Sequence, residues 1–150
     1  MTTPYTGLHF HIVLSTKGRA PLLAEELGRA MVREMGDAAP TLDGNLIAVG
    51  WIPDHMHLLV HLGPGTCLAR FVEGIKAGSS LRANTQLTGD RVFEWQEGYV
   101  AFTVCAQDAG RVAKYILHQE ETHKWLSLAE ELLRLRRSDL RTVGARPGGW

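Results

Sequence analysis

The sequence has too few cysteines, too short apolar runs and too balanced a charge for several classes of protein. Its two cysteines, Cys67 and Cys105, cannot make a disulfide framework. The apolar runs extend over only a few residues, so we expect no membrane-spanning segment, and we expect no secretory leader. Sixteen Lys and Arg residues balance sixteen Asp and Glu residues, which argues against a protein that coats duplex DNA by charge alone. These absences predict a cytoplasmic protein.

The composition that remains is that of an ordinary folded protein. Of the 150 residues, 45% are hydrophobic and 21% are charged, which suits one compact domain with a core. No repeat, linker or low-complexity stretch divides the chain. We expect a single domain over residues 1–142, followed by a disordered tail at 143–150 that is rich in Arg, Pro and Gly.

Strands are predicted at residues 8–15, 45–51, 55–62 and 99–105. The first is rich in β-branched and aromatic residues and ends at a polar turn. The second follows a turn at Asp43 and Gly44. Pro53 and Asp54 separate it from the third, so these two strands are expected to form a hairpin.

Helices are predicted between and after these strands. Pro21 suits the first turn of a helix that extends to about Gly36, with Leu or Met at every fourth position. Thr66 is expected to cap a helix that continues beyond Gly78. The helix after the last strand is expected to begin at Asp108 and to carry Tyr115, His118, Gln119 and His123, and an amphipathic helix to follow at about 126–137.

The order βαββαβα predicts an α+β, ferredoxin-like fold. In the split βαβ plan the strands form an antiparallel sheet, and we expect the helices on one face of it.

The strand at 55–62 carries the first candidate site. Its period of two places His55, His57 and His61 with Leu59 on one face, and Met56, Leu58, Val60 and Leu62 on the other. Neutral imidazoles bind first-row divalent ions, and residues two apart on a strand lie about 7 Å apart. The same spacing is also common in polar surface. His9 and His11 repeat it on the first strand, and His61 lies one pair further along, where it would support the site or lie on the surface.

Tyr115 and Gln119 form the second candidate site. Four residues apart on a helix, they are expected to project from one face. A phenol with a pKa near 10 is a poor nucleophile, so a covalent role for Tyr115 needs a metal-polarised electrophile beside it. Taken alone, Tyr115 is also explained by packing.

Four stretches together carry a resemblance to a known family. They are FHIVLSTKGRAPLL from Phe10, WIPDHMHLLV from Trp51, FEWQEGYVAFTV from Phe93 and YILHQEETHKW from Tyr115. In this order they resemble the single-strand transposases of the HUH superfamily. In the HUH motif U is a bulky apolar residue between two histidines, and here the motif would be His55, Met56 and His57. More narrowly, the chain resembles the one-tyrosine class of insertion sequence 200/605 type, or its REP-associated tyrosine transposase relatives.

The resemblance implies a site and a reaction. His55, His57 and Gln119 would bind Mg²⁺ or Mn²⁺, and Tyr115 would attack a single strand to give a 5′-phosphotyrosine and a free 3′-hydroxyl, without a nucleotide cofactor. The substrate would be single-stranded DNA with hairpins at element ends. The resemblance also implies a homodimer, nucleoid-associated in a bacterium or archaeon, in which the partner subunit supplies the tyrosine; whether Tyr115 acts in cis or in trans stays open.

Several further residues have two readings each. Lys17, Arg19, Lys76 and Arg82 are candidate DNA contacts, although solvated surface explains each equally well. Asp54 would orient a ligand histidine or cap the turn. Trp95 and Tyr99 suit a core or an interface more than a base-stacking platform.

Alternative functions remain open at this point. A domesticated relative that processes repetitive palindromes would use the same chemistry, and a catalytically silent nucleic-acid-binding module would keep only the fold. A zinc hydrolase of unrelated fold is disfavoured because no carboxylate base stands beside the histidines as in HExxH.

Overall fold

The computed structural model describes residues 3–123 and 127–140, and it divides the chain into two compact units that meet between Gln119 and Glu120. The first unit contains β1 (His9–Ser15), α1 (Glu25–Ala38), β2 (Gly44–Ile52), β3 (His55–Leu62), α2 (Leu68–Gln86), β4 (Val100–Val104) and α3 (Ala109–Leu117). Then follow α4 (Gln119–His123) and α5 (Leu128–Leu140). Each unit is described by itself.

The four strands of the first unit form one antiparallel sheet in the order β2-β3-β1-β4. The chain order of strands and helices is the predicted one, and β2 pairs with β3 as the predicted hairpin. The α+β, ferredoxin-like fold class is therefore confirmed. The two central strands are β1 and β3, so the residues of these strands are the most completely covered.

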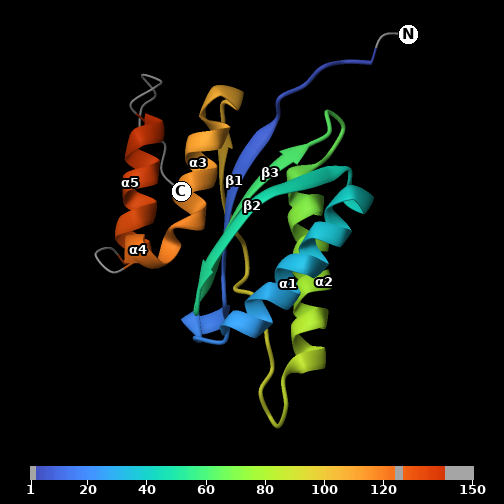
Figure 1. Ribbon diagram of the computed structural model, residues 1–150, viewed down its shortest axis with the longest axis vertical. Helices are drawn as coiled ribbons and strands as arrows, with labels where there is room; N and C mark the ends of the chain where they lie inside the picture. The colour runs from blue at the N-terminus through green and yellow to red at the C-terminus, as the bar shows by residue number, and fades with distance from the viewer. Residues whose placement is uncertain (1–2, 124–126, 141–150) are drawn as a thin grey trace. The chain divides into compact units, whose positions relative to one another are not determined.

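Helices cover both faces of the sheet, which corrects the expectation of helices on one face. Met56, Leu58 and Val60 belong to a core that includes residues of α1 and α2. Leu59 points the other way and packs with Ile116 of α3. Figure 1 shows α1 and α2 on one side of the sheet and α3 on the other. The histidine face thus carries enough apolar surface to hold a helix of its own.

Two predicted helix starts are wrong because tertiary hydrogen bonds compete with them. α1 begins at Glu25, not at Pro21, since the Leu23 amide donates to the Pro53 carbonyl and holds the preceding segment outside the helix. The α2 N-cap position is Cys67, not Thr66. The Thr66 hydroxyl instead bonds to the carbonyl oxygen and carboxylate of Asp43.

The helix after β4 is also shorter than predicted. α3 ends at Leu117, and His118 leaves the helical region with φ −107° and ψ 32°, so Gln119 is the first residue of α4. Asp108 does occupy the N-cap position, but its carboxylate accepts from Arg111 and makes no capping bond to the backbone. Tyr115 and Gln119 therefore lie on either side of a break and not on one continuous helix.

In the second unit, α5 begins with a capping box. The Glu130 carboxylate accepts from the Ser127 amide and hydroxyl, and the Glu130 amide donates back to the Ser127 hydroxyl. These bonds hold the pKa of Glu130 below its usual value. The helix extends to Leu140, close to the predicted 126–137. The predicted tail at 143–150 lies outside the described residues, and the single domain over 1–142 stays a prediction.

Two smaller expectations concern cysteines and membranes. Cys67 and Cys105 are both exposed free thiols. Within the described ranges, no helix has the length and apolar character that crossing a bilayer requires.

Candidate active site

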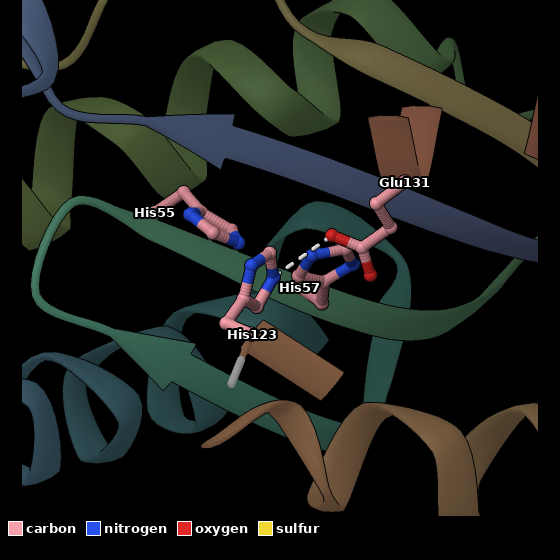
Figure 2. A group of neighbouring side chains, drawn as sticks. All are labelled: His55, His57, His123 and Glu131. Atoms are coloured by element: carbon pink, nitrogen blue, oxygen red, sulfur yellow. Dashed lines mark ion pairs between the residues drawn. The ribbon is translucent and has the colours of Figure 1, made fainter. Parts of the chain in front are cut away.

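The candidate site is built on β3, a strand that is buried along nearly its whole length. His55 and His57 are both 0% exposed, and their ring centroids lie 5.2 Å apart. Figure 2 shows the two imidazoles next to each other. The period-two prediction is thus confirmed for these two residues, but they are interior groups and not polar surface.

His55 is held from outside the sheet by a carboxylate. Its Nδ1 lies 2.7 Å from Asp54 Oδ1, and Asp54 Oδ2 accepts from the Arg19 guanidinium at 2.7 Å. Partial burial alone would raise the pKa of Asp54, but the hydrogen bonds and charges of His55 and Arg19 lower it below its usual value. Of the two readings of Asp54, orientation of a ligand histidine is the one that this geometry supports. With the Nδ1 proton so engaged, Nε2 is the ring nitrogen that carries the lone pair.

His57 is held by a second histidine that sequence analysis treated only as an example of a common pattern. His11 Nε2 lies 2.7 Å from His57 Nδ1, and His11 is 3% exposed. Burial, and then the charge of His57, lower the pKa of His11 to about 3, so its ring is neutral. The sequence contains a signal for this contact. Alternate residues of β1 face one side of the sheet, as in β3, and antiparallel pairing sets His11 opposite Leu59, which lies on the histidine face of β3.

Tyr115 lies against this pair in the same chain. Its ring centroid is 6.2 Å from that of His57 and 6.1 Å from that of His11, and both contacts are edge-on. The structure therefore brings the predicted nucleophile and the predicted ligand histidines together in cis. A tyrosine supplied by a partner subunit stays a prediction.

Gln119 reaches the site because β2 has no side chain at Gly50. Gly50 is directly opposite His57 in the register, and a Cβ there would collide with the Ile116 carbonyl oxygen and stand 3.2 Å from Gln119 Cγ. Gln119 is 2% exposed, and its side-chain amide lies 3.5 Å from the Tyr115 carbonyl oxygen. Gly50 was missed from the sequence, although a glycine inside a strand often marks a close approach of another segment.

The predicted DNA contacts have varied surroundings. Lys17 pairs with Glu94 at 2.9 Å, Arg19 pairs with Asp54, and Lys76 donates to the carbonyl oxygens of Gln96 and Gly98. These bonds give the three side chains structural partners. Arg82 instead lines a groove beside α1.

The remaining aromatic and histidine candidates fall outside the site or support it. His61 donates from Nε2 to the Thr6 carbonyl oxygen, and its ring contacts that of His9 at a tilt of 56°, with the centroids 5.1 Å apart. Trp95 belongs to the core and donates to the Ser79 hydroxyl, whereas Tyr99 is 41% exposed. The preference for a core or interface position is confirmed for Trp95, which lies in the core, and stays a prediction for Tyr99.

The second unit contains an ion pair of its own. His123 Nε2 lies 2.9 Å from Glu131 Oε2, which Figure 2 marks with a dashed line. This pair links α4 to α5 within the unit. His118, predicted beside it on one helix, lies at the break and bonds through Nδ1 to the Lys114 carbonyl oxygen.

Comparison with known families now decides the class of protein. The family model described as IS200-like transposase matches residues 4–119, which is well over half of the 150 residues. The chain belongs to the IS200-like transposase family. This transposase is a DNA-processing enzyme, and the alternative of a zinc hydrolase with an unrelated fold is excluded.

Curated relatives agree with the family match. The ISDra2 transposase TnpA of Deinococcus radiodurans is 26% identical over 121 residues, which cover 76% of this chain and 85% of that protein. The transposase for insertion sequence element IS200 of Salmonella typhimurium is 27% identical over 121 residues, covering 77% of this chain and 78% of the relative.

Solved structures share the fold of this IS200-like transposase. A transposase candidate from Deinococcus radiodurans has a TM-score of 0.62 at 23% identity and covers 77% of this chain and 95% of that chain. A REP-associated tyrosine transposase bound to a REP hairpin also has a TM-score of 0.62, at 16% identity, covering 84% and 76%. At these identities the likeness supports the fold.

The contact between Gly50 and α3 generates a prediction. Gly50→Ala forces α3 away from β2, because the added Cβ collides with a backbone oxygen. A displacement of about 1 Å can cost on the order of 100-fold in rate, so we expect a loss of DNA cleavage of that order with circular dichroism unchanged. Gly36→Ala, whose Cβ would meet nothing within 4 Å, is the control. Normal cleavage by Gly50→Ala would contradict the role of this gap.

Proposed function

We propose that this transposase cleaves and rejoins single-stranded DNA at element ends through a 5′-phosphotyrosine on Tyr115, with a divalent metal bound by His55, His57 and Gln119. The observation that carries the proposal is the buried histidine pair with Tyr115 beside it in the same chain. A domesticated relative that acts on repetitive palindromes would use the same residues, and the DNA that flanks the gene distinguishes the two.

The side chains fit a divalent ion. Both histidines have their Nδ1 atoms engaged by other side chains. The partner of His55 is a carboxylate, which can only accept, so the His55 proton is on Nδ1 and its Nε2 faces a metal with the lone pair. Gln119 would add an amide oxygen, and a mixed nitrogen and oxygen set suits Mn²⁺ or Mg²⁺ with positions left for substrate oxygens. When bound, such an ion polarises the scissile phosphate and stabilises charge on the leaving oxygen.

The reaction transfers one phosphoryl linkage. The Tyr115 phenol oxygen attacks phosphorus, the bond from phosphorus to the 3′ oxygen breaks, and the phenol proton is balanced by the proton on the new 3′-hydroxyl. The number of phosphodiester bonds is conserved, so a 3′-hydroxyl can reverse the step without a nucleotide cofactor. The buried rings of His11 and His57 flank the phenol and cover one side of it.

We propose that the DNA also binds away from the cleaved phosphate, in a groove beside α1 and α2. The groove has a volume of about 730 Å³, and its lining includes Arg29, Arg33, Arg82 and Arg91 but only one acidic residue, Glu26. Arg29 pairs with Glu25 at 2.7 Å, so Arg33, Arg82 and Arg91 carry most of the positive charge of the groove. Since the formal charge of the chain is zero, these arginines are a local concentration of positive charge that suits phosphates. A structural neighbour bound to a REP hairpin supports hairpin-bearing DNA as the partner.

A homodimer is part of the proposal. In the sheet order β2-β3-β1-β4 the outer strands are β2 and β4. An outer strand presents unpaired backbone groups, and pairing it with a second copy of the chain would satisfy them.

Tyr115→Phe should abolish the covalent DNA adduct and leave DNA binding nearly unchanged, because only the nucleophilic oxygen is removed. The measurement is a denaturing gel of the protein incubated with labelled single-stranded DNA and Mn²⁺. Tyr99→Phe, another partly exposed tyrosine, is the control and should form the adduct. A covalent band that survives in Tyr115→Phe would reject the assignment, and no band with the wild type would favour a silent binding module.

His57→Ala should lose metal affinity and metal-dependent cleavage, and Gln119→Ala should lose both less completely. Removing a ligand should cost more than the roughly 10- to 100-fold that loss of an outer partner costs. Calorimetric titration with Mn²⁺ measures the affinity, with His118→Ala as the control because His118 bonds to the backbone of α3. Unchanged Mn²⁺ affinity in His57→Ala would remove this histidine from the metal site.

Arg82→Gln should weaken DNA binding and leave the cleavage rate at saturating DNA unchanged. Loss of one phosphate contact should lower the slope of log affinity against log salt by about 0.7 to 0.9. Arg70→Gln removes an equally exposed arginine from the other end of α2 and should leave the slope unchanged. Equal slopes for the two variants would place the DNA elsewhere.

Mixed dimers test whether Tyr115 acts in cis or in trans. We combine a His57→Ala chain with a Tyr115→Phe chain and assay cleavage by the purified, differently tagged pair. With sites in trans, which the sequence resemblance implies, one site of two is intact and activity returns. With sites in cis, as in the single chain described here, every site carries one defect and the mixture stays inactive.

A further inference from the structure

We propose that His11 is a positioning residue, which fixes the tautomer and ring orientation of His57 by accepting a hydrogen bond from its Nδ1. The inference rests on the proposed function, because it assigns the means by which one metal ligand is aligned. The contact that carries it joins His11 on β1 to His57 on β3.

The direction of the hydrogen bond between the two imidazoles decides which nitrogen of His57 can bind a metal. His11 Nε2 and His57 Nδ1 lie 2.7 Å apart, so one of them donates a proton and the other accepts it. If His57 donates, its proton is on Nδ1 and its Nε2 carries the lone pair that binds a metal. If His11 donates, the proton of neutral His57 is on Nε2, and the ring cannot bind a metal there.

The surroundings of His11 hold it in place for this contact. It lies on β1, a central strand that pairs with β3 and β4, and it is 3% exposed. Phe102 and Tyr115 lie near its ring, with centroids at 6.2 and 6.1 Å. An imidazole on a packed central strand has few alternative rotamers, so the position of its Nε2 is well defined.

The two ligand histidines are thus oriented by chemically different partners. Asp54 holds His55 through a carboxylate that Arg19 also pairs with, whereas His11 holds His57 through a neutral ring. An imidazole acceptor fixes the proton on Nδ1 without a carboxylate standing next to Tyr115. A bulky residue that merely filled this space could not choose between the tautomers of His57.

The test measures the tautomer of His57 directly. Long-range ¹H–¹⁵N NMR spectra of the metal-free protein, assigned with His57→Gln, distinguish a proton on Nδ1 from one on Nε2. We expect Nδ1–H in the wild type and in His11→Gln, whose side-chain oxygen can still accept. In His11→Phe, which keeps the volume but not the acceptor, we expect Nε2–H or a mixture, together with about 10- to 100-fold weaker Mn²⁺ binding by calorimetry.

His9→Phe is the matched control, because His9 lies on the same face of the same strand but contacts the ring of His61. It should leave the His57 tautomer and the Mn²⁺ affinity unchanged. A wild-type proton on Nε2 of His57 would overturn the proposal, as would a folded His11→Phe variant with normal tautomer and affinity. Should His11→Phe not fold, the wild-type tautomer decides. The tautomer is measured without metal or DNA, so its result does not depend on the proposed function. The proposed function would be rejected separately, by wild-type protein that neither binds Mn²⁺ nor forms an adduct.

Discussion

The burial of β3 on both faces is the constraint on which the rest of the structure depends. Alternate residues pack under α1 and α2 on one side and under α3 on the other, so neither face can change without disturbing a helix layer. A shift of the strand by one residue would place His55 and His57 in the apolar core and Met56 in the candidate site. The same packing that stabilises the sheet therefore fixes the direction of the two imidazoles.

Burying two imidazoles creates a need for hydrogen-bond partners, and the structure meets it from two directions. An unpaired buried polar group costs on the order of 1 to 3 kcal/mol. The turn before β3 supplies Asp54, and the neighbouring strand supplies His11. The carboxylate is ionised and the imidazole is neutral, so the two buried histidines are held by partners of different charge.

Sequence analysis predicts those features that depend on short-range periodicity. The strand at 55–62, its two faces and the chain order of elements follow from alternation and turn residues, and the structure confirms them. The start of α1 and the role of Thr66 could not be predicted, because both depend on partners that are distant in the sequence. The Leu23 amide bonds to the Pro53 carbonyl oxygen, and the Thr66 hydroxyl bonds to Asp43. His11 and Gly50 acquire their importance only through partners that lie 46 and more residues away in the chain.

The separation of the arginine groove from the histidines constrains any DNA that uses both. The sheet lies between α1 and α2, which border the groove, and α3, which carries Tyr115. A helix layer alone is about 10 Å thick, so a phosphate in the groove cannot be the one that Tyr115 would attack under the proposed function. At about 3.4 Å of rise per nucleotide, several nucleotides must separate the two phosphates. Under the proposed function, a short unstructured strand would thus be cut without occupying the groove. DNA that folds and passes round the sheet would gain affinity from the arginines, so binding and chemistry would be separately adjustable.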